Sequence, residues 1–468
     1  MHKEKLCLSQ ALLYAVPTLP IALLFGSIPI IQGIYAKYFG LSLTAIASII
    51  LTARVIDAVT DPIVGYVSDR YFLSKGTRKV FIVSGGLLCI VCGYFLYVPS
   101  GHNFTAPYDP VSSLYLLSWL VLFYISWTLF EIPHLAWGSD LAGSSQDKNR
   151  VFSLRALGTY LGTLLFLAIP LLPIFDSQGY TPHTLAWAVL ISAILMVPSL
   201  YFSFQLIPDR NVKCQLSGYS IDRDALIQRN DMGLRRLIVV TTSNKPFLVF
   251  VATFFFAGFG GGMSMGLTYI FAESYLGIGE YLPNIYLLSI GIAMVSIAGW
   301  HWLAAVFGKT LSWGMGMVGM SVSFLSLALL APGEDSWLNL LFLQVIIYTC
   351  STAAVVFPPA ILSSIIDYGH WKFRQDYSGI YYSLYTFIIK LSLAGGSAFG
   401  LAIAGIYGFD AASSKHSPEH IFGLQLGLAY IPALMLLVSL VLVAVAPITE
   451  RRQKIIRARL DSRVVRYK

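Results

Sequence analysis

The sequence predicts an all-α membrane protein in which twelve transmembrane helices form two six-helix bundles, related as pseudo-symmetric repeats. Three observations predict this class. The chain of 468 residues is 56% hydrophobic and only 12% charged, whereas soluble domains carry roughly 25% charged residues. Apolar runs long enough to cross a bilayer recur along the whole chain. None of them alternates with the two-residue period of a membrane barrel, whereas a helix satisfies its own backbone hydrogen bonds in lipid.

The first six predicted helices lie within residues 1–207, the N-terminal bundle. Even the shortest run, 80–98, is close to the roughly 20 residues that a spanning helix needs. The first run is too long for the core of a signal peptide and lacks a small-residue cleavage site, so we interpret it as an uncleaved helix. The six runs are 11–36, 43–68, 80–98, 112–136, 152–175 and 184–207.

A polar, charged segment, 208–246, separates these helices from six more, and we interpret it as a cytoplasmic linker. The C-terminal bundle, 247–447, is followed by a basic cytoplasmic tail, 448–468. The seventh run contains "AGFGGGMSMG", which indicates either close helix packing or a broken helix. The last six runs are 247–275, 283–305, 311–331, 337–362, 379–407 and 423–447.

The distribution of lysine and arginine predicts the orientation of the chain. Of the 31 lysine and arginine residues, 26 lie in the termini and in the loops that join even-numbered to odd-numbered helices; the exceptions are Lys37, Lys415 and three residues within helices. Because positively charged loops stay in the cytoplasm, we expect both termini there, in a multi-pass protein of the bacterial inner (plasma) membrane. The net charge of +8 is then explained by contact with anionic membrane lipid, and no nucleic-acid partner is expected.

The two halves contain similar loops. "IPHLAWGSDLAGSSQDKNRVFSLR" and "PPAILSSIIDYGHWKFRQDYSGIYYSLYTF" each have a proline, then an aspartate (Asp140 or Asp367) seven or eight residues later, then basic residues. Two bundles related as parallel repeats are typical of transporters that bind a solute near the membrane midplane and rock around it.

Seven charged residues fall inside predicted helices: Arg54, Asp57, Asp61, Glu131, Arg155, Glu273 and Lys390. At roughly 2.5–3.5 kcal/mol each, they would cost on the order of 20 kcal/mol if they faced lipid, so they must face one another or water. We expect ion pairs between Arg54 and Asp57 and between Glu131 and Arg155. This pairing leaves one carboxylate in the first half, for which Lys390 of the other bundle is the nearest candidate cation.

Asp57 and Asp61 are four residues apart and therefore share one face of the second helix. Two carboxylates with a hydroxyl such as that of Thr128 supply the oxygen ligands that a small cation prefers, and the same group can hold a proton. Sodium and protons thus both remain open as the bound ion. No catalytic constellation, metal cluster, cofactor site or ATP-binding motif is recognised, so we expect a protein that is not an enzyme and needs no cofactor.

Three segments resemble signatures of the glycoside–pentoside–hexuronide:cation symporters, the melibiose permease group of the major facilitator superfamily. They are "RVIDAVTDPIVGYVSDR", "TLFEIPHLAW" and "DYGHWKFRQDYSGIYYSLYTFIIKL", and the resemblance covers essentially the whole chain. It implies the major facilitator fold and a cation site at Asp57, Asp61 and Thr128. It also implies the following solute-binding residues: Glu131, Arg155, Thr386 and Lys390.

A further segment, "GYVSDRYFLSKGTRK", resembles the cytoplasmic gate motif of the superfamily, although a solvated basic loop would look similar. The resemblance implies that its residues latch the two halves together. With the two loop aspartates, the predicted gating residues are Gly65, Asp69, Arg70, Arg78, Lys79, Asp140 and Asp367.

Two positions depart from the melibiose permeases. Ile21 stands where those proteins have an acid that holds the sugar, and Leu135 replaces the aromatic residue that packs on the galactosyl ring. The sodium-coupled lysophospholipid transporters look similar at the paired aspartates and also lack the acid. Galactoside specificity is therefore not predicted.

The leading hypothesis is a secondary active symporter, a monomer that couples a monovalent cation, Na⁺ or H⁺, to a small solute by alternating access. A sugar or glycoside is the first expectation for the solute, and an amphiphile such as a lysophospholipid is the alternative. A membrane scaffold or sensor that does not transport is a hypothesis of a different class.

Overall fold

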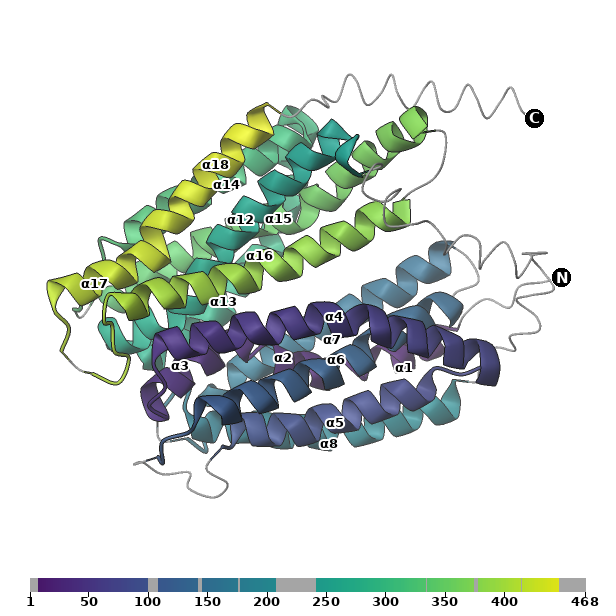
Figure 1. The fold of residues 1–468 in the computed structure, drawn as a ribbon, viewed down its shortest axis with the longest axis horizontal. Coiled ribbons are helices and arrows are strands. Elements are labelled where there is room, and N and C mark those ends of the chain that lie inside the picture. The colour runs from purple at the N-terminus through teal and green to yellow at the C-terminus, as the bar shows by residue number, and fades with distance from the viewer. Residues whose placement is uncertain are drawn as a thin grey trace. The chain divides into compact units, whose positions relative to one another are not determined.

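The computed structural model describes residues 7–99, 108–141, 145–175, 177–207, 241–333, 335–373, 378–413 and 415–445. Helices are the only regular secondary structure in these segments (Figure 1). Twelve of the helical stretches are long and apolar enough to cross a membrane, and each coincides with one predicted run. The predicted all-α membrane fold is confirmed.

The first six spans contain eight α-helices because the first span is divided into three. These helices are α1 (Leu8–Ala15), α2 (Thr18–Phe25), α3 (Ile28–Tyr38), α4 (Leu43–Lys75), α5 (Lys79–Tyr97), α6 (Ser113–Leu141), α7 (Ser145–Ala168, then a 3-10 turn Ile169–Leu171) and α8 (Pro182–Leu206).

The last six spans begin with α12 (Lys245–Ile270), which continues into a π-helical turn, Phe271–Tyr275. The others are α13 (Leu282–Phe307, preceded by a 3-10 turn Gly279–Tyr281), α14 (Lys309–Leu327), α15 (Ser336–Phe373), α16 (Ser378–Ile406), and α17 (Pro418–Gln425) joined through the π-helical turn Leu426–Tyr430 to α18 (Ile431–Ala444).

Several helices extend beyond the apolar runs that predict them. α4 continues to Lys75 rather than ending at residue 68, and α15 continues to Phe373 rather than ending at residue 362. The apolar signal stops where the hydrocarbon of the membrane stops, whereas helical hydrogen bonding continues into the polar region. The extension of α4 carries Asp69 and Arg70, so these residues are helical rather than part of a loop.

The chain divides into two compact units. The first contains Met1–Ile221 with two short pieces, Gly279–Asn284 and Asp410–Ser414, and the second contains the remainder. Of the predicted linker 208–246, residues 208–240 lie outside the described segments, as does the whole tail 448–468.

Four helix pairings recur in both units. In the first, α2 of the first span packs on α7 and α8 of the fifth and sixth spans, and α5 packs on α6 and α8. In the second, α12 packs on α16 and α18, and α14 packs on α15 and α18. Because corresponding spans pair in both units, the bundles are pseudo-symmetric repeats, as the sequence predicts.

The glycine-rich part of α12 is a close-packing surface. A Cβ atom at Gly262 would lie 2.1 Å from the carbonyl oxygen of Leu393 in α16, and one at Gly266 would lie 2.3 Å from Ser397 Oγ. α12 is unbroken from Lys245 to Ile270. Of the two interpretations of "AGFGGGMSMG", close packing is confirmed and a broken helix is wrong.

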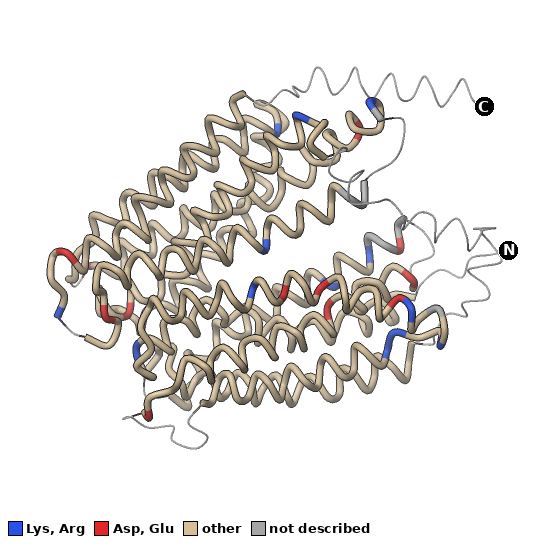
Figure 2. The backbone as a smooth tube through the Cα atoms, in the orientation of Figure 1, with Lys and Arg blue, Asp and Glu red and all other residues tan. Residues whose placement is uncertain are grey.

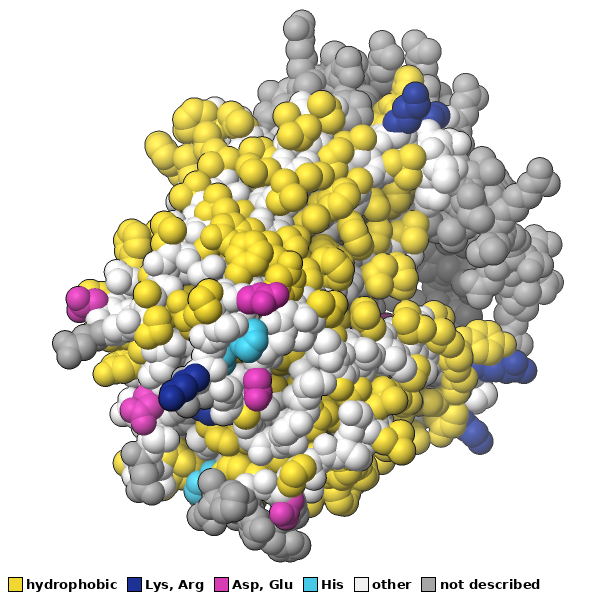
Figure 3. All heavy atoms as spheres, turned by 60° about the vertical axis from the view of Figure 1, so that its left-hand side comes forward, with side chains coloured by type: hydrophobic (Ala, Val, Ile, Leu, Met, Phe, Trp, Pro, Cys, Tyr) yellow, Lys and Arg dark blue, Asp and Glu magenta, His cyan; other side chains and the backbone are white. Residues whose placement is uncertain are grey.

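The distribution of side chains fits a membrane-spanning protein. Large apolar residues are exposed along the helices, for example Val295 at 78% and Val55 at 65% of their accessible surface. Hydrophobic side chains cover much of the face drawn in Figure 3. Charged residues lie mainly near helix ends and in loops, and few interrupt the middle of a helix (Figure 2). Those few build the candidate site.

Candidate functional site

Two carboxylates of α4 and one hydroxyl of α6 meet in the interior of the first unit. The Asp57 side chain is only 2% exposed, and Thr128 is fully buried. The Thr128 Oγ1 atom lies 3.2 Å from Asp57 Oδ1 and 2.9 Å from Asp61 Oδ1. The three residues predicted to hold a cation are therefore in direct contact.

The single hydroxyl hydrogen of Thr128 limits how many of these carboxylate oxygens the hydroxyl can donate to. A threonine hydroxyl has one hydrogen and can donate to one acceptor at a time. When Thr128 donates to Asp61, at the shorter distance, its oxygen lies next to Asp57 Oδ1 with no hydrogen of its own between them. Three oxygens gathered in this way form a group that a small hard cation or an added proton can satisfy.

Arg54 occupies the other oxygen of Asp57. Its Nη1 atom lies 3.3 Å from Asp57 Oδ2, and its guanidinium lies 4.2 Å from the centre of the Tyr124 ring. The predicted pair is confirmed, and the ring fixes the direction of the arginine by a cation–π contact. Because Arg54 takes Oδ2, Asp57 Oδ1 is directed to Thr128.

Glu131 and Arg155 form the second predicted pair. Arg155 Nη2 of α7 donates to Glu131 Oε1 of α6, and the side chain of Arg155 is 16% exposed and that of Glu131 19%. Arg155 Nε is buried and has no hydrogen-bond partner within the described segments. The two charged groups of this pair are therefore partly accessible, whereas the Arg155 Nε atom is enclosed.

The position of α6 depends on a glycine of the neighbouring helix. A Cβ atom at Gly85 of α5 would lie 2.4 Å from the backbone nitrogen of Phe130. Only a glycine allows α6 to lie this close to α5. Since Phe130 precedes Glu131 by one residue and follows Thr128 by two, this contact helps to set the position of both site residues.

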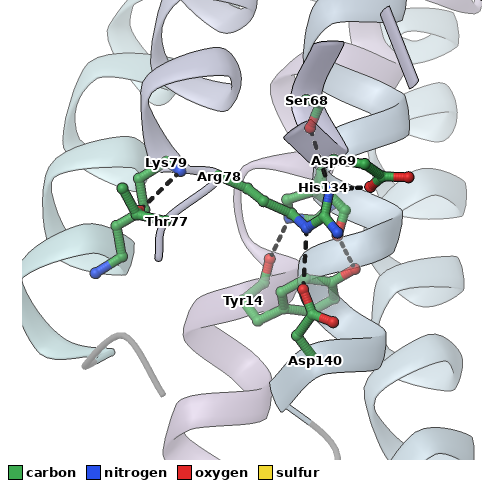
Figure 4. Close-up of polar contacts among 8 residues, drawn as sticks. All are labelled: Tyr14, Ser68, Asp69, Thr77, Arg78, Lys79, His134 and Asp140. Atoms are coloured by element: carbon green, nitrogen blue, oxygen red, sulfur yellow. Dashed lines mark hydrogen bonds and ion pairs between the residues drawn. The ribbon is translucent and has the colours of Figure 1, made fainter. Parts of the chain in front are cut away.

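Figure 4 shows a second ionic cluster, at the predicted cytoplasmic end of the first unit. Arg78, the N-cap of α5, is buried; its Nη1 donates to Asp69 Oδ1 at 2.6 Å and to Ser68 Oγ at 3.2 Å. Its Nε donates to Asp140 Oδ2 at 3.0 Å. Gly76, with φ of +79°, ends α4 in the left-handed conformation and turns the chain toward Arg78. One arginine thus joins the ends of α4, α5 and α6.

Other predicted gating residues of the first unit have different partners. Lys79 Nζ donates to the carbonyl oxygens of Phe204 and Ile207, at 3.2 and 2.8 Å, and so binds the end of α8. Arg70 donates to Tyr66 Oη at 3.1 Å. Gly65 lies on α4, where a Cβ atom would be at an ordinary distance from α6. Within this unit the structure brings together Asp69, Arg78 and Asp140, but not the whole motif.

The remaining predicted residues belong to the second unit. Thr386 and Lys390 lie one turn apart on α16, where Thr386 Oγ1 donates to the carbonyl oxygen of Tyr382 at 3.0 Å. Asp367 lies on α15. Glu273 lies in the π-helical turn that follows α12.

Sequence reasoning missed Tyr124 and Ser68, which contact Arg54 and Arg78. Tyr124 lies one turn before Thr128 on α6, and this four-residue spacing was the available signal. Ser68 precedes Asp69 directly, and nothing in its own type or position distinguishes it from a helical serine.

Comparison with known proteins gives one family match. A family model described as "MFS/sugar transport protein" matches residues 13–450. YagG of Escherichia coli (strain K12), named as a glycoside/cation symporter, is 23% identical over 434 residues, covering 91% of this chain and 88% of YagG. The sodium-dependent lysophosphatidylcholine symporter 1 of Homo sapiens is 24% identical over 440 residues, covering 87% of this chain and 77% of the human protein.

Solved structures share the fold. The nucleoside transporter NupG superposes with a TM-score of 0.61 at 14% identity, covering 93% of this chain and 97% of NupG. The inward-open xylose transporter XylE of E. coli superposes with a TM-score of 0.57 at 16% identity, covering 96% and 97% of the two chains. At these identities the likeness concerns the arrangement of helices alone.

Proposed function

Because the chain belongs to the MFS/sugar transport protein family and its relatives are named as cation-coupled symporters, we propose that it is a secondary active transporter in which Asp57, Asp61 and Thr128 bind the coupling cation. Its site lies in a multi-pass membrane protein, which we assign to the bacterial plasma membrane with both termini in the cytoplasm. The ion is Na⁺ or H⁺.

One observation carries this proposal. Two carboxylate oxygens lie 3.2 and 2.9 Å from a single hydroxyl that has one hydrogen to share. An ion pair that served only the fold would be complete with Arg54, and buried pairs add little stability over apolar side chains. A cation bound among these oxygens would be ligated by both aspartates and by the hydroxyl that joins them.

The same helix connects the cation site to the proposed solute site. Thr128 and Glu131 are three residues apart on α6, so they are neighbours along that helix. Binding of a cation between the aspartates neutralises negative charge near Glu131 and strengthens solute binding, and linkage makes this effect reciprocal. Transport then follows from alternating access, with binding on one side of the membrane and release on the other.

We propose Glu131 and Arg155 of the first unit, and Thr386 and Lys390 of the second, as the residues that bind the solute. Carboxylate, guanidinium, ammonium and hydroxyl groups can hydrogen-bond to sugar hydroxyls, which favours a sugar or glycoside. We further propose that the Arg78 cluster, the other predicted gating residues of the first unit and Asp367 act at the cytoplasmic gate.

A lysophospholipid is the second candidate solute. Ile21 of α2, buried and apolar, occupies the position of the sugar-binding acid, and the partly buried Leu135 replaces the stacking aromatic. An acyl chain packs favourably on such residues. A relative of similar identity is named for lysophosphatidylcholine.

Uptake into reconstituted vesicles tests the proposal. The probes are xylose, glucuronate, melibiose and lysophosphatidylcholine, each supplied with an inward sodium gradient, an inward proton gradient or no gradient. We expect one probe to accumulate only with a gradient, and we expect Asp57→Asn to abolish its accumulation. Asp109→Asn, in an exposed loop, is the matched control and should transport normally.

Two results would overturn parts of the proposal. Undiminished gradient-driven accumulation in Asp57→Asn would remove the cation assignment. If the wild-type protein accumulated none of the four probes and sodium and protons did not alter its thermal stability, a scaffold or sensor would replace the symporter.

A further inference from the structure

The first transmembrane span is broken beside the candidate solute site. α1 ends at Ala15 and α2 begins at Thr18. Pro17 has no N–H, so the carbonyl oxygen of Leu13 lacks its helical donor. It accepts instead from Ser203 Oγ of α8 at 2.5 Å. The break is therefore held by side chains of other helices.

A reciprocal pair of hydrogen bonds joins the last turn of α1 to α6. Tyr14 Oη donates to the carbonyl oxygen of His134 at 2.9 Å, and His134 Nε2 lies 3.0 Å from the carbonyl oxygen of Tyr14. The two rings stack with their centres 4.2 Å apart and their planes 7° from parallel. Figure 4 shows both side chains. Because a carbonyl oxygen only accepts, Nε2 must carry a proton and donate it.

The pair is tightly enclosed. Tyr14 and His134 are both fully buried, and the Phe130 ring lies against His134 with centres 5.0 Å apart. A Cβ atom at Gly138 would lie 2.4 Å from Tyr14 Oη. His134 Nδ1 has no hydrogen-bond partner within the described segments. Within the described segments this imidazole therefore forms its hydrogen bond through Nε2.

The position of the pair relates it to solute binding. His134 lies three residues after Glu131, and Trp127 lies four residues before Glu131, so all three lie within two turns of α6. Trp127 stacks on Phe25, near the end of α2, with ring centres 4.6 Å apart. α6 thus holds the first span through His134 before the break and through Trp127 at the other end of α2.

We propose that His134 is a positioning residue for the solute. Its Nε2–H fastens the break of the first span to α6, so that α2 lies beside the Glu131–Arg155 pair in the geometry that binds solute. The cation site uses contacts between α4 and α6, which His134 does not make. This inference rests on the proposed transport function, and it predicts that His134 governs solute affinity without governing cation affinity.

Three substitutions of His134 separate the contribution of its hydrogen-bond donor from that of its ring. His134→Gln places an amide donor about as far along the side chain as Nε2, His134→Asn reaches only as far as Nδ1, and His134→Phe retains a ring for stacking but has no donor. The measured quantities are KM and Vmax for whichever of xylose, glucuronate, melibiose and lysophosphatidylcholine the wild-type protein accumulates. The half-saturating sodium concentration for thermal stabilisation is measured without solute.

We expect His134→Phe and His134→Asn to raise KM by about tenfold or more, because the buried carbonyl oxygen of Tyr14 loses the hydrogen bond from His134. Gln should restore KM to within about threefold of the wild-type value, because the donor is retained. Vmax and the half-saturating sodium concentration should change little in all three variants. Hydrogen–deuterium exchange over residues 8–25 should increase in Phe and Asn and remain near wild type in Gln.

Two outcomes would overturn the proposal. Wild-type KM and exchange in His134→Phe would show that ring stacking alone holds the break. A loss of sodium affinity parallel to the loss of solute affinity would show that His134 supports the whole fold. If the wild-type protein accumulated none of the four probes, the proposed transport function would fail separately, and hydrogen–deuterium exchange over residues 8–25 would alone decide whether His134 positions the first span.

Discussion

Replacement of Thr128 by valine tests the cation site with a minimal change of shape. Thr128→Val exchanges the hydroxyl for a methyl group at a fully buried position. The methyl group would face Asp57 Oδ1 and Asp61 Oδ1, from which the hydroxyl oxygen lies 3.2 and 2.9 Å away. The variant keeps both carboxylates and removes the oxygen that joins them.

At these distances the hydroxyl is within hydrogen-bonding reach of both carboxylates, so the energy of such a bond sets the expected loss of sodium affinity. A hydrogen bond to a charged group contributes about 1.5–3 kcal/mol, and a factor of ten in affinity corresponds to about 1.4 kcal/mol. If the hydroxyl oxygen ligates the cation with comparable strength, its loss should weaken sodium binding by about 10- to 100-fold. The partly buried Asp61 Oδ1 atom also loses the hydrogen bond from Thr128, so the sodium-free protein should unfold more easily by about 1–3 kcal/mol.

Thermal unfolding of the purified protein measures both effects. A ligand that binds only the folded state adds RT ln(1 + [L]/Kd) to stability, so the midpoint temperature plotted against sodium concentration reports Kd. Choline chloride replaces sodium chloride to keep the ionic strength constant. Thr159→Val is the matched control, since that exposed hydroxyl donates to the Arg155 carbonyl oxygen at 3.2 Å.

The reasoning would be refuted if Thr128→Val responded to sodium at the wild-type concentration. It would also fail if Thr159→Val weakened sodium binding equally, because the effect would then not depend on the oxygens around Asp57. A proton-coupled protein would show the corresponding shift in its pH dependence, at constant low sodium.

Three further substitutions test other parts of the structure. Gly85→Ala places a Cβ atom 2.4 Å from the backbone of α6 and should destabilise the protein by about 1–3 kcal/mol in thermal unfolding, whereas Gly291→Ala, with open space around it, should not. Arg78→Gln removes the partner of two carboxylates, one of them exposed, and should cost about 3 kcal/mol in the same assay; Arg70→Gln, which loses one exposed contact with a tyrosine, should cost under about 1 kcal/mol. Glu131→Gln should reduce uptake of the transported probe by about 10- to 100-fold yet retain sodium-dependent stabilisation, and a variant that lost both together would contradict separate solute and cation sites.

The number and order of the spans could be predicted because each depends on composition over about 20 residues. Helix ends could not, since they depend on local hydrogen bonding after the apolar signal has stopped. The helical part of α4 that follows residue 68, with Asp69 and Arg70, is such a case. The break at Pro17 was visible as a proline, but whether a proline bends or interrupts a helix depends on partners such as Ser203, far away in the sequence.

The ion pairs of the site could be predicted from the free-energy cost of exposing charged side chains to lipid and from the positions of these residues in the sequence. Arg54 and Asp57 are three residues apart on one helix, and Glu131 and Arg155 are oppositely charged residues of neighbouring spans. The reciprocal hydrogen bonds between Tyr14 and His134 could not be predicted, because a separation of 120 residues leaves no periodic signal in the sequence.

The partners of the gate-motif residues could likewise be predicted only in part. The resemblance grouped Asp69 with Arg78 as latch residues, and in the structure the two side chains form an ion pair within the first unit. It also treated Lys79 as part of the same latch, whereas the Lys79 ammonium binds the last carbonyl oxygens of α8. Adjacent residues of a loop can point to different helices, and only the packed structure determines which.

The central claim is that the two aspartates of α4 hold a positive ion, and calorimetric titration of the purified protein with sodium chloride tests it most directly. Repeating the titration in buffers of different ionisation enthalpy counts the protons displaced by sodium. We expect saturable sodium binding in the wild-type protein and its loss in both Asp57→Asn and Asp61→Asn. If the coupling ion is H⁺, the same two variants should instead lose a proton-uptake step that the wild-type protein shows in a pH titration. Saturable binding that persisted unchanged in the two variants would place the ion elsewhere and contradict the account.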